Sequence, residues 1–252
     1  MFSSAIAVKT VSEDAKRGVF EIEGLFAGYG MTVGNALRRT LLSSLQGVAI
    51  TEFKVKGAPH EFSTLPGVRE DLVELLLNFK RLRFRMHTDE PHVLALKVKG
   101  EKTVTAADIQ ADAEVELMNP DEVIAHLTAK DAELDIELKV ERGLGYSAVE
   151  ARKGQGRLPI GTIAVDAIFT PVLRVSYTVD NMRVGERTDY NRLRLEIDTD
   201  GSVSPSHALS QAVQIMKDHF EKVLGLVTVQ SFEAPAAEAA EEKPKKKAKK
   251  KE

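Results

Sequence analysis

The chain of 252 residues contains no cysteine. This absence excludes disulfides, zinc–cysteine sites and a thiol nucleophile, and it is neutral about the cellular compartment. Long hydrophobic runs are also missing, because no apolar stretch approaches the ~20 residues that a helix needs to cross a bilayer. The N-terminus lacks the basic region and the long apolar stretch of a secretory signal. We therefore expect a soluble, cytoplasmic protein that makes no membrane contact.

A strong charge of one sign is missing as well, since the formal net charge is only −3. Residues 234–252 hold seven Lys and four Glu, a net charge of +3, which leaves −6 on the rest of the chain. A domain that grips a nucleic-acid backbone normally carries a basic surface, so the body is not expected to take DNA as its main ligand. Residues 230–252 are predicted to form a disordered Lys-rich tail. Nucleic-acid binding through this tail is an alternative function.

Motifs for catalysis are absent too. The Gly28–Gly34 turn has the spacing G-x-G-x-x-x-G, one residue longer than a dinucleotide fingerprint, and the strand end about 20 residues later carries Lys54 and Lys56 instead of an acidic residue. The six histidines form no metal motif, and no paired acidic motif for two metal ions occurs. The residues therefore predict no catalytic, cofactor-binding or metal-binding site, and a binding or assembly protein. The rival is a nucleotide-binding enzyme in which the glycine turn holds phosphate.

What the sequence does contain is a strand followed by a glycine turn and a helix. The helix is predicted over Gly34–Leu45, with Thr32 as N-cap and Gly47 as the C′ residue. Its apolar residues recur every four positions and form one stripe, Val33, Leu37, Leu41 and Leu45. Arg39 lies about 200° around the helix from Leu37 and points away from the stripe, with Leu42 on its own side. An arginine beside apolar surface is typical of a protein interface.

Two further helices are indicated. Apolar spacing predicts one that ends near Lys80 and is capped by Ser63 or Thr64. The other begins at Pro205 after a Ser204 cap. Its stripe has the spacing 4-3-4-3 and consists of Leu209, Val213, Met216, Phe220 and Val223. The spacing alone leaves packing into the chain's own core and helix-mediated dimerisation equally open. Residues 83–142 are rich in strand signals, and residues 143–161 are predicted to be a loop.

Two sequence blocks carry a resemblance to a known family. GNALRRTLLSS begins at Gly34, and HEFSTLPGV begins at His60 and is followed by the helical segment EDLVELLLNFK. LPIGTIAVDAIFTPV and RTDYNRLRLEI match more weakly and come in the family's order. The sequence resembles bacterial RNA polymerase alpha subunits over about residues 5–229.

The resemblance implies an α+β fold in two parts. A discontinuous dimerisation domain is expected from residues 1–46 and 171–229, with a mainly β domain, residues 47–170, inserted into it. The implied function is non-catalytic: the chain forms a homodimer and scaffolds assembly of the beta and beta-prime subunits, which carry the catalytic metal. DNA is contacted only indirectly. The family's chains continue into a DNA-binding domain, so this chain is expected to be a short form.

The resemblance also assigns roles to residues, matched motif by motif. Arg39 and Leu42 are expected at the beta contact, and Lys80 and Val165 at the beta-prime contact. The helices over 34–46 and 205–224 are expected to form the dimer. The expected dimer residues are Leu37, Leu41, Leu45, Leu209, Val213, Met216 and Phe220.

Overall fold

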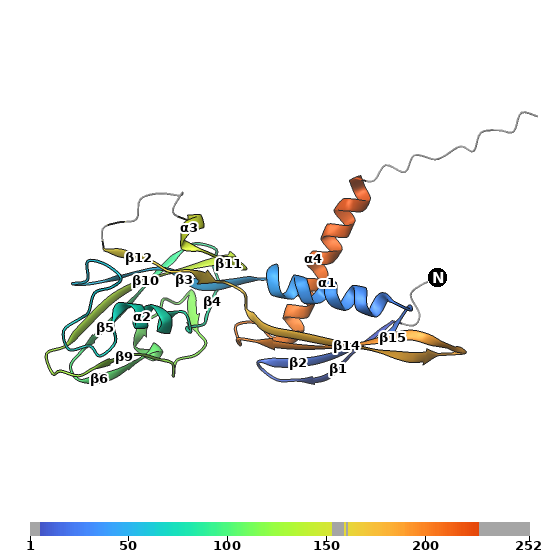
Figure 1. Cartoon of the computed structure of the whole chain (residues 1–252), viewed down its shortest axis with the longest axis horizontal. Coiled ribbons are helices and arrows are strands. Elements are labelled where there is room, and N and C mark those ends of the chain that lie inside the picture. Colours follow the sequence, from blue (N-terminus) through green and yellow to red (C-terminus); the bar gives the residue numbers. More distant parts are fainter. Residues whose placement is uncertain (1–5, 153–158, 160, 227–252) are drawn as a thin grey trace, which may run out of the picture.

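The computed structural model of the chain describes residues 6–152, 159 and 161–226. These residues form a mixed helix and strand structure in which strands predominate, as the predicted α+β class requires. The molecule is elongated, with one sheet at each end (Figure 1). The Lys-rich tail predicted at 230–252 lies outside the described residues.

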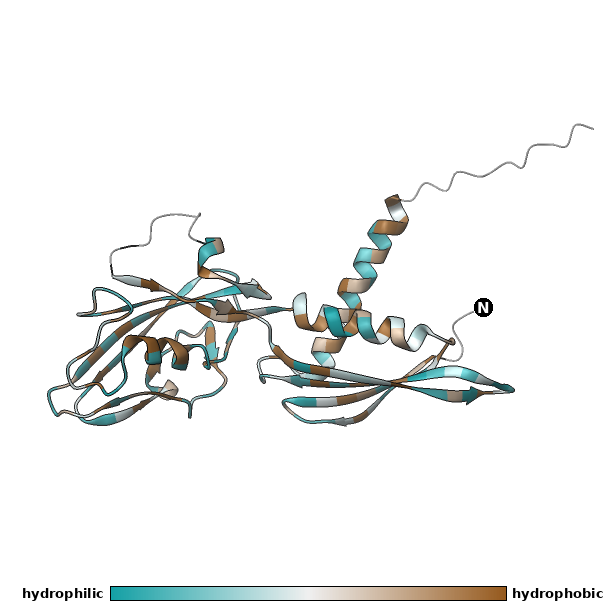
Figure 2. Cartoon of the chain, in the orientation of Figure 1, coloured by the Kyte–Doolittle hydropathy of each residue, from teal (hydrophilic) through white to brown (hydrophobic). Residues whose placement is uncertain are grey.

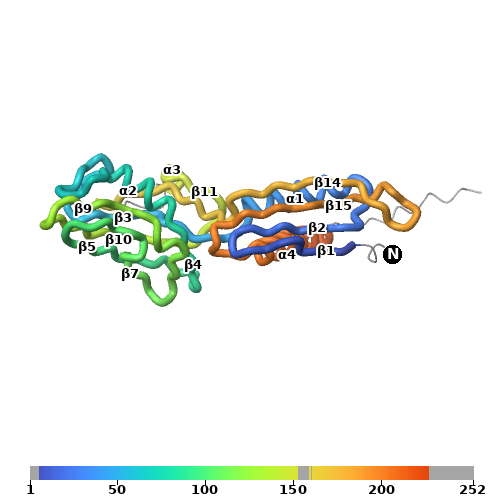
Figure 3. The backbone as a smooth tube through the Cα atoms, turned by 90° about the horizontal axis from the view of Figure 1, so that it is seen from below, coloured from blue at the N-terminus to red at the C-terminus, as the bar shows by residue number. Residues whose placement is uncertain are grey.

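A four-stranded antiparallel sheet forms one end, in the order β1-β2-β15-β14. Its strands are β1 (Ala7–Glu13), β2 (Arg17–Leu25), β14 (Val172–Val184) and β15 (Arg187–Thr199). Helices α1 (Tyr29–Ser43) and α4 (Pro205–Leu226) lie on the same side of this sheet (Figures 1 and 3). We call this sheet, with both helices, the four-stranded part. It combines the first and the last segments of the described chain, residues 7–43 and 172–226.

A five-stranded sheet in the order β12-β3-β10-β5-β7 forms the other end. Its strands are β3 (Gln46–Val55), β5 (His92–Lys99), β7 (Ile109–Gln110), β10 (Glu133–Leu144) and β12 (Thr162–Ala164). Around it lie α2 (Leu72–Phe79), α3 (Val149–Arg152), the 3-10 turn η1 (Ala106–Asp108) and three two-stranded ladders. The ladders pair β4 (Phe84–Met86) with β8 (Val115–Leu117), β6 (Lys102–Thr105) with β9 (Val123–Leu127), and β11 (Tyr146–Ser147) with β13 (Ala167–Ile168). Residues 46–169 are called the five-stranded part.

Each sheet has its own hydrophobic core, and the two cores share no residue. One is built from alternate residues of β2 and β15 together with the α1 stripe, for example Phe20, Leu41 and Leu195. The other surrounds Phe53 and Phe79, whose rings meet edge to face with centroids 5.2 Å apart. The alternation of apolar and polar residues along the strands is visible in Figure 2. Alternation places one face of each sheet on its core and the other toward solvent.

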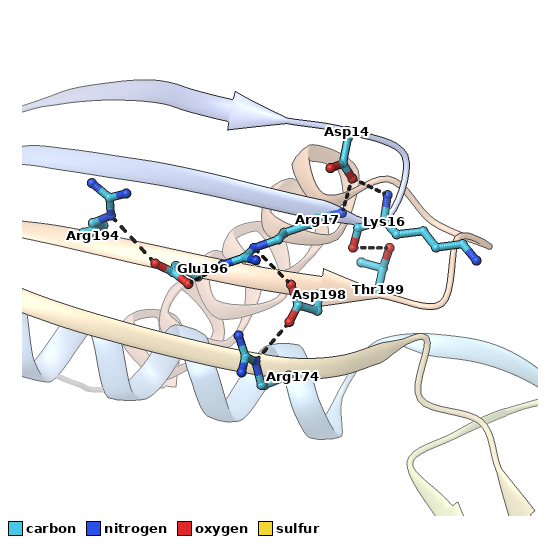
Figure 4. A network of polar contacts seen from close by, with 8 residues as sticks. All are labelled: Asp14, Lys16, Arg17, Arg174, Arg194, Glu196, Asp198 and Thr199. Carbon is cyan, nitrogen blue, oxygen red and sulfur yellow. Dashed lines mark hydrogen bonds and ion pairs between the residues drawn. The ribbon is translucent and has the colours of Figure 1, made fainter.

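The uncovered face of the four-stranded sheet is held by ion pairs instead of apolar packing (Figure 4). Arg17 lies 3.1 Å from Glu196 and 3.6 Å from Asp198, and Arg174 donates to Asp198 at 3.0 Å. Asp14 accepts from the backbone N–H groups at the start of β2 and so closes the β1–β2 turn. Opposite charges on neighbouring strands stabilise the register of the sheet modestly.

The backbone passes between the two parts at a crowded point. A Cβ on Gly47 would lie 1.6 Å from the Phe169 carbonyl oxygen, and a Cβ on Gly143 would lie 2.6 Å from the Phe169 ring. Only glycine allows these segments to approach so closely. The prediction that Gly47 ends the first helix was therefore wrong, since Gly47 lies in β3.

The first helix also begins earlier than predicted. It covers Tyr29–Ser43 rather than Gly34–Leu45, and its N-cap is Gly28 at φ +82° instead of Thr32. Gly30 is buried against Val179 and Asn191, so tertiary packing fixes the start of the helix within the glycine run. Sequence pattern alone could not place this boundary because the capping partner comes from β15.

Two other local predictions need correction. The N-cap of α2 is Asp71, whose carboxylate accepts from the Glu74 N–H at 2.7 Å, and neither Ser63 nor Thr64 caps it. The segment predicted as a loop over 143–161 contains the end of β10, strand β11 and helix α3. The Ser204 cap of α4 is confirmed by a 3.4 Å bond from the His207 N–H.

Candidate assembly surfaces

The glycine turn before α1 is occupied by the chain's own side chains. The Asn191 side-chain oxygen accepts from the Gly28 N–H at 2.8 Å and from the Gly30 N–H at 3.3 Å. A Cβ on Gly34 would come within 2.8 Å of Tyr177. The glycines therefore allow α1 to pack closely on the sheet, and the N–H groups that a phosphate would need are directed at Asn191.

Arg39 lies on the exposed side of α1, as its spacing from Leu37 predicted. Within the described residues, its guanidinium makes no hydrogen bond or ion pair. It lines a groove of about 740 Å³ between α1 and α4, together with Tyr177, His219 and Phe220. An exposed guanidinium without a partner keeps all its donors for a carboxylate of another molecule.

Leu42 is only partly buried, and it packs against the core of the four-stranded part. Its carbonyl oxygen accepts from the Thr170 hydroxyl at 3.2 Å, which ties the end of α1 to the segment before β14. Leu42 therefore has both a structural role and some surface left for contact.

The apolar stripe predicted for the first helix is buried inside the chain. Leu37, Leu41 and Leu45 are at most 2% exposed, and Leu209 of α4 is 8% exposed. All four belong to the core of the four-stranded part. Their burial leaves almost no side-chain surface for contact with a second copy.

The stripe of α4 behaves differently along its length. It is buried up to Ala212 and partly buried at Met216, but Val213 is 48% and Phe220 66% exposed. The apolar residues that follow are also exposed, by 57% at Val223, 76% at Leu224 and 83% at Leu226. Figure 1 shows why, since the second half of α4 extends beyond α1 and away from the sheet. Such a row of exposed apolar side chains is typical of an interaction surface.

Lys80 and Val165 lie near each other at the edge of the five-stranded part. Lys80 is the C-cap of α2, and its Nζ lies 3.4 Å from the Asp166 carboxylate. Val165 is 1% exposed, and its carbonyl oxygen accepts from Arg152. Its side chain is therefore not available to a partner, whereas Lys80 and Asp166 are partly exposed.

Residues that the motif comparison did not single out surround this ion pair. The Asp166 carboxylate accepts from the Val149 N–H at 3.0 Å, and this bond, helped by the Lys80 ammonium, holds the pKa of Asp166 below its usual range. Some burial and the nearby Asp166 charge raise the pKa of Tyr146, which is 64% exposed. Ile168 is 50% exposed and pairs with Tyr146 across the β11–β13 ladder. No local pattern in the sequence indicated this cluster, because its members come from two helices, two strands and a connecting segment.

The described residues include no group of three His, Asp or Glu side chains placed to hold a metal ion. His60 and Ser63 lie 3.2 Å apart in an exposed loop. Of the helices in the described part of the chain, none is both long and apolar enough to cross a membrane.

Comparison with known proteins agrees with this architecture. The family model described as "RNA polymerase Rpb3/RpoA insert domain" matches residues 48–170, which covers most of the five-stranded part. The DNA-directed RNA polymerase subunit alpha of Moorella thermoacetica is 47% identical over 229 residues, covering 91% of this chain and 72% of the relative. The chain belongs to the bacterial RNA polymerase alpha-subunit family.

Other members match to a similar degree. The alpha subunit of Symbiobacterium thermophilum is 48% identical over 221 residues, with 88% of this chain and 70% of the relative covered. That of Desulforamulus reducens is 45% identical over 243 residues, with 95% and 76% covered. As a bacterial alpha subunit, the chain is a component of DNA-directed RNA polymerase, a nucleotidyltransferase complex that performs transcription.

Proposed function

We propose that this alpha subunit is the assembly scaffold of its polymerase: it forms a homodimer and binds the beta subunit through α1 and the beta-prime subunit near Lys80. The observation that supports this most directly is the distribution of exposed groups. An unpaired Arg39, the uncovered second half of α4 and the Lys80–Asp166 pair form three separate surfaces. A scaffold needs several binding surfaces and no reaction centre.

For the dimer we propose the exposed residues of α4 as the contact, namely Val213, Phe220, Val223 and Leu224, with Met216 at the margin. Burying a large apolar side chain stabilises an interface by about 1.5–3 kcal/mol. The buried residues Leu37, Leu41, Leu45 and Leu209 would hold α1 and α4 at the angle the dimer needs. In a two-fold dimer the same row of side chains would be used by both copies.

For the beta contact we propose Arg39 with the exposed part of Leu42. The guanidinium can form a bidentate bond to a partner carboxylate while the neighbouring leucine loses its water. Removing one side of such a buried pair costs about 2–5 kcal/mol of binding. The lack of any internal partner for Arg39 among the described residues supports this assignment.

For the beta-prime contact we propose Lys80 as a direct contact and Val165 as its support from below. Leu77, three residues before Lys80 and therefore on the same side of α2, is 53% exposed and adds apolar surface. Val165 holds the backbone next to Asp166 through its own burial and through a 2.9 Å bond from its N–H to the Thr51 carbonyl.

We propose the domain division 1–46 plus 171–229 and 47–170, which the two separate cores support. The proposed place of action is the cytoplasm, with DNA contacted through the assembled enzyme. Nucleic-acid binding through residues 230–252 remains the alternative function. It predicts an affinity that falls steeply with salt and disappears when these residues are deleted.

Affinity purification of the tagged chain co-expressed with the beta and beta-prime subunits of its host tests the proposal. The unaltered chain should retain both large subunits. Arg39→Ala should remain dimeric and lose beta, whereas Lys80→Ala should keep beta and lose beta-prime. Arg38→Ala is the matched control because Arg38 is the neighbouring arginine of α1 and is also exposed. Normal beta retention by Arg39→Ala would refute the beta assignment.

A further inference from the structure

The two parts of the molecule pack around separate hydrophobic cores. Their cores share no residue, and the backbone crosses between them only near Gln46 and near Thr170 within the described chain. Parts of a chain that share a small polar interface are expected to move relative to each other unless something fixes the angle.

Two arginines of the five-stranded part form bonds to the four-stranded part. They come from the segment that begins β4, and their target is the turn between β15 and α4. The Arg85 Nε donates to the Ser202 carbonyl at 2.9 Å, and its Nη2 lies 3.4 Å from the Gly201 carbonyl. The Arg83 Nε lies 3.7 Å from the Asp200 carboxylate, whose side chain is only 9% exposed.

The turn that receives them is already ordered by its own bonds. One oxygen of Asp200 accepts from the Ser202 N–H at 2.9 Å and from the Ser202 hydroxyl at 2.6 Å. The Asp200 N–H donates to the Pro171 carbonyl at 3.0 Å, which joins the turn to the start of β14. Gly201 has φ +95°, a conformation suited to glycine. The arginines therefore bind a rigid element, and α4 starts three residues after Ser202.

Arg83 is equally fixed on its own side. Its Nη1 donates to the Lys80 carbonyl at 2.8 Å and to the Leu82 carbonyl at 3.0 Å. Guanidinium donors suit this position because the last carbonyls of a helix lack partners within the helix. One side chain thus connects the end of α2, which carries Lys80, to the turn that positions α4.

We infer that Arg83 and Arg85 form a latch that fixes the angle between the two parts and so sets the distance from the α4 surface to Lys80. For its consequence this inference rests on the proposed function, since that distance decides whether one dimer can hold both large subunits. The latch itself is a property of the isolated chain. It can therefore be tested without any partner.

The absence of cysteine allows two spin labels to be placed without background. Exposed positions in the two parts are Ser210 on α4 and Lys130 before β10, each changed to Cys. Dilution into excess unlabelled chain leaves one labelled copy per dimer. Double electron–electron resonance should give one narrow distribution of the distance between the two labels in the parent chain. For Arg83→Ala with Arg85→Ala, the width should grow about twofold or the mean should move as other orientations become populated.

The matched control is Arg81→Ala, because Arg81 pairs with Glu122 inside the five-stranded part at 3.6 Å and is 68% exposed. Asp200→Asn is a milder second variant that removes the charge facing Arg83 and keeps an oxygen for Ser202. It preserves a test should the double variant fail to fold by circular dichroism. An unchanged distribution in a folded double variant, or in Asp200→Asn if the double variant does not fold, would overturn the latch.

A second measurement separates the latch from the proposed function. If both hold, beta-prime affinity of the double variant should fall about tenfold, or 1.4 kcal/mol, with Lys80 intact. A broadened distribution with unchanged beta-prime affinity would support the latch and contradict its proposed role in assembly. A parent chain that binds no beta-prime would contradict the proposed function and leave the distance result valid.

Discussion

The two parts of this alpha subunit use their helical stripes in different ways. In the five-stranded part, α2 is eight residues long and buries Leu72, Leu75 and Phe79 completely. In the four-stranded part, α4 is 22 residues long and buries its stripe only as far as Ala212, leaving Phe220 and Leu224 exposed. The stripe of α2 ends with its core, whereas the stripe of α4 continues beyond it.

This difference distinguishes apolar residues that pack inside the chain from apolar residues that remain available to a partner. A helix needs an apolar stripe only where the chain's own core covers it, and apolar surface beyond that core remains in water at a cost of about 25 cal/mol per Å². The second half of α4 is therefore the place where a partner gains most. The five-stranded part places exposed apolar groups beside the Lys80–Asp166 ion pair, which suits a more polar contact.

The largest expected effect tests whether the cores are independent. Leu41→Ala and Leu75→Ala each remove a side chain that is 0% exposed, and each should cost about 2–5 kcal/mol of unfolding free energy. Hydrogen exchange with mass spectrometry should show faster exchange in the four-stranded part for Leu41→Ala and in the five-stranded part for Leu75→Ala. Faster exchange in both parts from either change would mean that the chain unfolds as one unit.

The next effect concerns the exposed stripe of α4. Phe220→Asp should convert the dimer to monomer, weakening association by at least about 2 kcal/mol, while the fold persists because the side chain is 66% exposed. Lys222→Asp is the control, since it lies on the opposite side of α4. Light scattering coupled to size exclusion measures the mass. Equal dimerisation of both variants would contradict the proposed contact.

A third effect is confined to the five-stranded part. Glu70 is 8% exposed and accepts from the His126 N–H at 2.7 Å, and its carboxylate lies 2.6 Å from the His126 ring. Burial disfavours its charge, but the bonds from His126 outweigh burial and lower the pKa of Glu70. A lowered folded-state pKa means stability that is present above the unfolded value, about 4.3, and is lost as pH falls through the folded value.

Glu70→Gln should therefore cost about 1–3 kcal/mol at neutral pH and reduce the acid sensitivity of the five-stranded part. Urea denaturation of the parent chain and the variant at pH 7 and pH 4 measures both effects. The gap in unfolding free energy between them should narrow at pH 4. A gap of equal size at both values would show that ionisation of Glu70 does not contribute.

The smallest effect is expected on the outer face of the four-stranded sheet. Arg174→Ala removes a 63% exposed side chain from Asp198 and should cost about 0–1 kcal/mol, decreasing further with added salt. Asp198 keeps Arg17 at 3.6 Å. If thermal unfolding shows a larger loss of unfolding free energy, the ion pairs of Figure 4 act as a cooperative network.

The amino-acid sequence by itself determined the class of the fold, the family and most strands and helices. Periodicity is a local property, so the stripes of α1 and α4 could be seen without a structure. The two long sequence blocks are specific enough to indicate the family, and the resemblance led to Arg39, Leu42 and Lys80, with Val165 coming from a weaker match, as the candidate contacts. Exposure of Arg39 also followed from its angle to Leu37.

Only the tertiary structure decided which residues of a stripe are covered. Leu41 and Phe220 occupy equivalent positions in their patterns, yet one is 0% and the other 66% exposed, because exposure depends on elements far away in the sequence. The same reason explains the misplaced start of α1, which Asn191 of β15 fixes, and the burial of Val165. The latch from Arg85 to Ser202 spans 117 residues, a separation at which no local pattern carries information.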